Sequence, residues 1–138
     1  MTPGQDASAD GKIYVIMPIS VDADAPKKKE AIARCAARRH LTPHFPMENV
    51  IAGEGPRQAV DRAVTSINRA RLVIADLSYE RPSCYYELGL AEALGAAVSL
   101  IAADGTDIHQ SSNRELVRFY SNLASYERVI NDILASID

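Results

Sequence analysis

Glu87 is the residue of this sequence best placed to do chemistry. It falls in the first turn of a helix predicted for residues 84–94, which follows a buried strand at residues 71–76. In open α/β sheets, ligands bind beside the carboxyl ends of the strands, and a carboxylate there can act as a nucleophile or stabilise a cation. The alternative is an ordinary first-turn acid that caps the helix. The apolar residues on the same helix face, which we expect to pack on the sheet, are Leu90, Ala91 and Leu94.

Strands and helices are predicted to alternate along the rest of the chain. This alternation is typical of a three-layer α/β sandwich that is flavodoxin-like or Rossmann-like, with about five mostly parallel strands in the order 2-1-3-4-5. The direction of the fifth strand stays open. The predicted strands are residues 12–18, 42–47, 71–76, 98–102 and 116–120, and the predicted helices are residues 27–39, 57–70, 84–94 and 123–137.

The turn after the first strand gives no support to two common nucleotide sites. Residues 18–20 read Pro-Ile-Ser, where a dinucleotide-binding turn or a P-loop would carry a glycine-rich fingerprint. We therefore expect no bound dinucleotide cofactor and no P-loop chemistry. The three histidines show no zinc-ligand spacing with either cysteine, so no metal site is expected either.

The composition limits the classes of protein to which this chain can belong. The 138 residues are 47% hydrophobic and 24% charged, which is ordinary for one globular domain, here residues 12–138 behind a disordered leader at residues 1–11. A net charge of −3 argues against nucleic acid as a partner. No apolar run reaches membrane-spanning length, and the N-terminus lacks a signal-peptide pattern. Two distant cysteines favour a reduced, cytoplasmic protein.

The residues around Glu87 resemble those of a known superfamily. Residues 74–78 read IADLS, and residues 85–95 read YYELGLAEALG, with Pro82 between the two segments. This pattern resembles the nucleoside 2-deoxyribosyltransferase-like superfamily, which includes nucleoside 5′-monophosphate N-glycosidases and TIR-like nucleotide-binding proteins. Residues 15–20, VIMPIS, are similar to the first strand of the TIR-like members. The resemblance spans about residues 12–137.

The resemblance implies roles for individual residues. The glutamate of its ELG motif is the catalytic carboxylate, which assigns that role to Glu87, and its first-strand tyrosine matches Tyr14. Asp76 either holds ribose hydroxyls or caps the following loop in an Asx-turn. Further substrate-binding candidates are Met17 and Pro18 after the first strand, Asp61 on the second helix, and Ser78, Arg81 and Ser83 before the Glu87 helix. Ser111 and Asn113 match residues that a neighbouring subunit donates, which implies a homodimer or higher homo-oligomer.

The resemblance also implies a reaction. The members cleave or transfer N-glycosidic bonds, so the expected substrate is a nucleoside or a nucleoside 5′-monophosphate. In such a cleavage, positive charge builds on the anomeric carbon, and a carboxylate stabilises it or forms a glycosyl-enzyme intermediate. Two alternatives stay open at this stage: a TIR-like enzyme that cleaves NAD, and a nucleotide-binding or signalling module without turnover.

Overall fold

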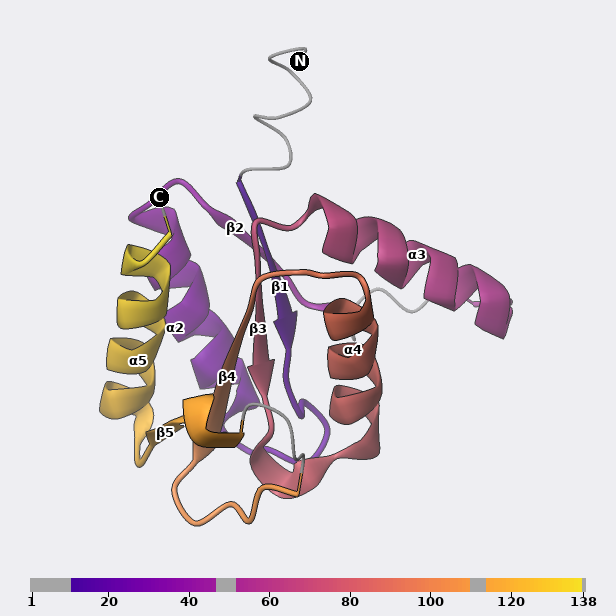
Figure 1. Ribbon diagram of the computed structural model, residues 1–138. Coiled ribbons are helices and arrows are strands. Elements are labelled where there is room, and N and C mark those ends of the chain that lie inside the picture. The colour runs from indigo at the N-terminus through magenta and orange to yellow at the C-terminus, as the bar shows by residue number, and fades with distance from the viewer. Residues whose placement is uncertain (1–10, 47–51, 110–113, 138) are drawn as a thin grey trace.

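Five parallel strands form a single sheet at the centre of the computed structural model, which describes residues 11–46, 52–109 and 114–137 (Figure 1). Every neighbouring pair of strands is parallel, in the order β2-β1-β3-β4-β5. This arrangement confirms the predicted strand order and settles the direction of the fifth strand. The strands are β1 (Lys12–Ile16), β2 (Thr42–His44), β3 (Leu72–Asp76), β4 (Val98–Ala103) and β5 (Arg118–Tyr120).

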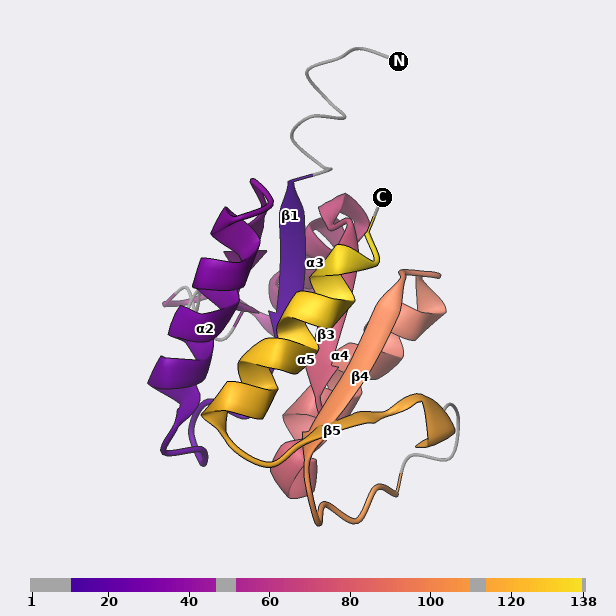
Figure 2. The ribbon, with the colours of Figure 1, turned by 90° about the vertical axis from the view of Figure 1, so that its left-hand side faces the viewer.

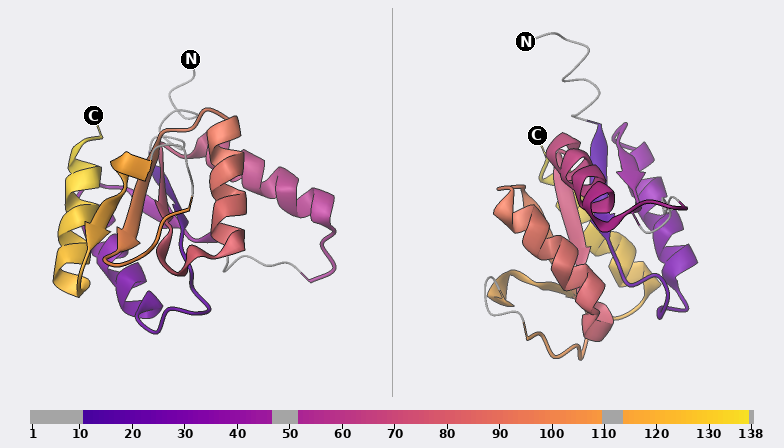
Figure 3. Two further views of the ribbon diagram at one scale, coloured as in Figure 1. Left: turned by 60° about the horizontal axis from the view of Figure 1, so that its bottom comes forward. Right: turned by 90° about the vertical axis from the view of Figure 1, so that its right-hand side faces the viewer.

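Two helices cover each face of the sheet, which makes the three layers (Figures 2 and 3). On one face lie α2 (Ala25–Ala37) and α5 (Leu123–Ala135), and on the other lie α3 (Pro56–Arg69) and α4 (Pro82–Ala93). Proline occupies the first turn of α2, α3 and α4, where its missing N–H costs nothing. Short 3-10 turns at Ser78–Glu80 and Arg114–Leu116 precede α4 and β5.

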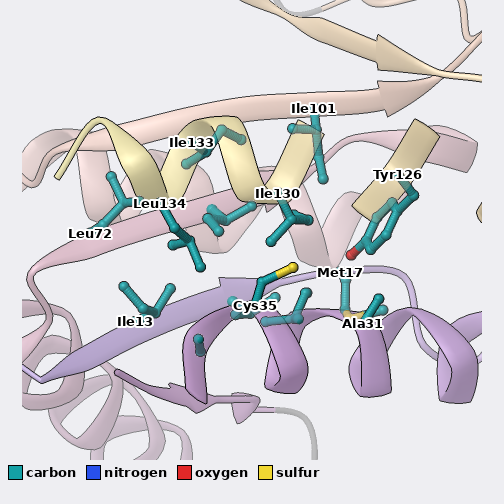
Figure 4. Packing of buried hydrophobic residues seen from close by; sticks show 14 of the residues in the cluster. Ile13, Met17, Ala31, Cys35, Leu72, Ile101, Tyr126, Ile130, Ile133 and Leu134 are labelled. Carbon is teal, nitrogen blue, oxygen red and sulfur yellow. The ribbon is translucent and has the colours of Figure 1, made fainter. Parts of the chain in front are cut away.

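The central strands are apolar on both faces because each face is covered. Successive side chains of β1 point to opposite layers, so Ile13 packs with α2 and α5 while Tyr14 packs with α3 and α4. Figure 4 shows the core between the sheet and helices α2 and α5, where Ile13 of β1 packs with Cys35 of α2 and Ile130 of α5. The sheet therefore carries Tyr14 on the face that α4, the helix of Glu87, also covers.

Helix α4 differs from its prediction in the face that it buries. The buried residues are Cys84, Leu88 and Ala91, whereas Leu94 is exposed. The prediction holds for Ala91 and in part for Leu90, which is partly buried against the core. It is wrong for Leu94 because it centred the apolar stripe on Glu87, one residue short of Leu88, which is a rotation of about 100°. Glu87 consequently lies at the border of the buried stripe and is only partly buried, which leaves its carboxylate accessible.

A buried polar network ties the carboxyl-end edge of the sheet together. The Lys28 ammonium donates to Asp22 Oδ2 at 2.5 Å and to the Tyr120 hydroxyl at 2.9 Å. The Tyr120 hydroxyl in turn donates to Asp76 Oδ2 at 2.7 Å and lies 2.9 Å from Ser78 Oγ. All five residues are buried, so each charge depends on its partners inside the protein.

Candidate active site

The centre of the candidate site is a hydrogen-bonded pair between Tyr14 and Glu87. Tyr14 lies on central strand β1, and its hydroxyl donates to Glu87 Oε2 at 2.8 Å. Glu87 lies in the second turn of α4, because the helix begins two residues earlier than predicted, at Pro82. The helix dipole acts mainly within the first turn, so the tyrosine hydroxyl, rather than the helix N-terminus, is the nearby group that stabilises the ionised glutamate.

Burial sets the proton affinities of this pair. Burial raises the pKa of Glu87, and the hydrogen bond from Tyr14 offsets only part of that rise. Burial and the adjacent carboxylate raise the pKa of Tyr14 well above its usual value, so its hydroxyl stays protonated and acts as a donor. Burial also raises the pKa of Cys84 to about 11, which keeps this neighbouring thiol protonated and a poor nucleophile at neutral pH. Of these two groups, Glu87 is therefore the better candidate for a nucleophile.

A cavity of about 350 Å³ opens beside the pair, between α3, α4, the middle of β1 and the end of β2. A volume in this range accommodates a small organic ligand. Its wall is mostly apolar, and a few polar side chains converge on it. The polar lining consists of Tyr14, His44, Arg62, Ser66, Ser83 and Glu87, and the remaining lining of Pro46, Pro56, Ala59, Val60, Ala63 and Tyr86.

Three of these polar residues, His44, Arg62 and Ser66, were not predicted from the sequence. The His44 ring stacks on the Tyr14 ring, with centroids 5.6 Å apart, because the parallel register places the two residues side by side on β2 and β1. Burial, with Lys12 and Arg62 nearby, lowers the pKa of His44, so the ring is neutral at neutral pH. Arg62 on α3 is held by Glu54, with Nε–Oε2 and Nη2–Oε1 distances of 3.0 and 2.5 Å.

Of the predicted residues near α3 and α4, one lines the cavity with the pair. Ser83, in the first turn of α4, is on the cavity wall, and Arg81 is the exposed residue that precedes the helix. Asp61 is exposed and lies 3.7 Å from Arg57, one helical turn away on α3. It does not line the cavity, because the next residue, Arg62, takes the inward position. The cavity wall therefore carries the cation Arg62 at the place where the acid Asp61 was predicted.

The other predicted residues lie away from the cavity lining or outside the described residues. Asp76 Oδ1 accepts from the Ser78 backbone N–H at 2.9 Å, the hydrogen bond that the Asx-turn alternative predicts. Met17 and Pro18 are buried, and the Met17 side chain belongs to the core layer under α2 and α5. Ser111 and Asn113 lie outside the described residues, so their contribution from a neighbouring subunit stays a prediction.

Within the described ranges, no group of three or more His, Cys, Asp or Glu side chains could hold a metal ion. The same part of the chain contains no helix whose length and apolar character would let it cross a bilayer.

Comparison with solved structures confirms the class of fold. The CMP N-glycosidase BcmB of Clostridium botulinum superposes with a TM-score of 0.66 at 17% identity, covering 88% of this chain and 98% of the enzyme. A 2-desoxiribosyltransferase of Leishmania mexicana superposes with a TM-score of 0.59 at 20% identity, covering 86% and 96%. The chain thus shares its fold with these two enzymes. No protein-family model and no curated protein match the sequence.

Proposed function

We propose that this protein cleaves the N-glycosidic bond of a nucleoside or nucleoside 5′-monophosphate, with Glu87 as the catalytic carboxylate. The observation that carries the proposal is the Tyr14–Glu87 pair at the wall of a cavity of about 350 Å³. The names of the two structural neighbours, an N-glycosidase and a deoxyribosyltransferase, support the same class of reaction. The site favours an enzyme over a binding module, because a partly buried carboxylate with a raised pKa at the wall of a cavity is typical of catalytic sites.

The arrangement suits this reaction chemically. As the C1′–N bond breaks, positive charge develops on the sugar, and the Glu87 carboxylate either captures C1′ or stabilises it as an ion pair. Tyr14 orients the carboxylate and leaves one of its oxygens available to the sugar. Ser83 and the first turn of α4 lie one helical turn before Glu87, where a 5′-hydroxyl or 5′-phosphate would meet a hydroxyl group and a helix N-terminus.

A nucleobase-release assay tests the proposal directly. The purified protein would be incubated with nucleosides, their ribo- and deoxyribo-5′-monophosphates, and NAD, and free base would be separated by chromatography. We expect release from at least one nucleoside or monophosphate. Release of nicotinamide alone would replace the proposal with NAD cleavage. A thermal shift on nucleotide addition without any release would favour a binding module.

Replacing Tyr14 with phenylalanine is expected to move the pH dependence of base release. The reaction needs ionised Glu87, so its rate falls at low pH as the carboxylate is protonated. The Tyr14 hydrogen bond lowers the pKa of Glu87, and its loss raises that pKa. The acidic limb of the kcat profile should therefore shift to higher pH, with a drop in rate of about 10-fold at neutral pH from the misoriented carboxylate. An unmoved acidic limb would contradict the assigned hydrogen bond.

A further inference from the structure

Arg62 has N–H groups that do not bond to Glu54, its partner in an ion pair. Its Nε and Nη2 atoms bond Glu54, and no other hydrogen bond joins Arg62 to a described residue. The two N–H groups of Nη1 therefore remain for a ligand in the cavity that Arg62 lines. The side chain is 33% exposed, and that of Glu54 is 13% exposed. Glu54 thus fixes the plane of a guanidinium group whose other edge is accessible.

Arg62 and Ser83 line the same cavity as Glu87 but come from different helices, Arg62 from α3 and Ser83 from α4. On the cavity wall, Arg62 is accompanied by Tyr14 of β1 and His44 of β2. Ser83 and the start of α4 lie one helical turn before Glu87 along the helix. If C1′ of the substrate meets Glu87 and its C5′ end meets Ser83, the base extends toward His44 and Arg62.

We propose that Arg62 binds an acceptor edge of the departing nucleobase, which selects oxo bases such as uracil or hypoxanthine and stabilises the base as it leaves. The proposal deepens the proposed function and depends on it for the assignment of Glu87 to C1′. A guanidinium group only donates hydrogen bonds, so it favours a carbonyl oxygen over the amino group that adenine carries at the same position. The apolar wall supplied by α3, including Ala59 and Ala63, is suited to the flat face of a base.

The same cation assists bond cleavage. The C1′–N bond breaks with both electrons going to the base nitrogen, so the base leaves as an anion and the sugar as a cation that Glu87 stabilises. In hydrolysis, water then supplies a hydroxyl group to C1′ and a proton to the base, which completes the balance. Arg62 lowers the barrier because the negative charge on the base forms in front of its guanidinium group. Glu54 acts as a positioning residue for the guanidinium group.

The test compares the wild-type protein with Arg62→Met on substrates that differ in one property at a time. We expect Arg62→Met to lower kcat/KM by about 10- to 100-fold for uracil and hypoxanthine substrates, the range for a hydrogen bond to a charged group, and by much less for adenine substrates. The loss should be smaller for 5-fluorouracil than for uracil substrates, because a more acidic base needs less help to leave. The same losses are expected in nucleosides and their 5′-monophosphates.

Two further variants control for charge and folding. Arg57→Met makes the same change on an exposed residue of the same helix, and it should leave all substrates unchanged. Arg62→Lys keeps the charge and still only donates hydrogen bonds, but it lacks the planar fork, so it should retain most of the leaving-group effect and part of the discrimination between bases. This variant also tests the proposal if Arg62→Met fails to fold.

Binding of the free bases separates this proposal from the proposed function. Ligand-observed NMR would measure uracil, hypoxanthine and adenine with each variant, without any turnover. Arg62-dependent preference for the oxo bases supports the proposal even if no substrate is cleaved. Equal losses for all bases overturn it, and so does a loss confined to 5′-monophosphates, which would make Arg62 a phosphate ligand. If Arg62→Met releases base at the parental rate, the role of Arg62 is overturned while the proposed function stands. If the protein neither releases nor binds any base, both the role of Arg62 and the proposed function are overturned.

Discussion

Replacing Glu87 with glutamine is expected to lower base release by roughly three orders of magnitude or more, the range seen when a central electrostatic or nucleophilic group is removed. The glutamine keeps the shape of the side chain, and its carbonyl oxygen can still accept the hydrogen bond from Tyr14. What it loses is the negative charge that faces the sugar cation. Burial raises the pKa of Cys84 to about 11, so the neighbouring thiol cannot replace it as a nucleophile at neutral pH.

The stability of Glu87→Gln provides the control for this result. Since burial raises the pKa of Glu87, the folded protein binds the proton more tightly than the unfolded chain does. That proton stabilises the fold at low pH, and the contribution is lost as pH rises from about 4.3, the ordinary pKa of a glutamate, through the raised value. The glutamine variant should therefore be more stable than the parent at neutral pH, with the difference vanishing below about pH 4. A variant that is folded and still releases base at the parental rate would contradict the assignment.

Replacing Lys28 with methionine is expected to lower the free energy of unfolding by about 3–5 kcal/mol. Methionine preserves most of the length of the side chain but leaves the Asp22 carboxylate buried without its cation. The Tyr120 hydroxyl also loses a donor, and the Lys28 ammonium no longer lies 4.7 Å from the centre of the Tyr120 ring. Urea denaturation followed by circular dichroism would measure the change.

The neighbouring residue supplies a matched control. Lys27 is exposed on the same helix, so Lys27→Met should change the free energy of unfolding by no more than about 0.5 kcal/mol. The double variant Asp22→Asn with Lys28→Met removes the stranded charge as well, and it should recover part of the loss through coupling of the two sites. Equal effects of Lys27→Met and Lys28→Met would show that the network contributes little to stability.

The sequence by itself determined the class of fold and the central candidates of the site. Apolar runs without alternation identify strands buried on both faces, and their alternation with helices leads to a parallel sheet, because parallel strands need crossovers. Glu87 and Tyr14 could be singled out because the motif around them resembles one superfamily. Local pattern suffices for such conclusions, since strand and helix periods are properties of neighbouring residues.

Only the tertiary structure decided which polar residues share the cavity. Asp61 and Arg62 are adjacent in sequence and therefore point about 100° apart around α3. The way α3 packs on the sheet exposes Asp61 and turns Arg62 toward the cavity. His44 reaches the cavity because the register of β1 and β2 sets it against Tyr14. Neither fact has a signal in the chain, because one residue of helix rotation and a cross-strand register are set by packing against distant elements.

The same limit applies to Asp76, which the sequence left with two possible roles. Its carboxylate accepts from Tyr120, 44 residues further along the chain, and from Ser78 within its own loop. Sequence spacing could propose the local hydrogen bond but not the distant one. The motif therefore indicated where chemistry could occur, whereas the packing of α3 and the pairing of β2 determined which side chains surround Glu87.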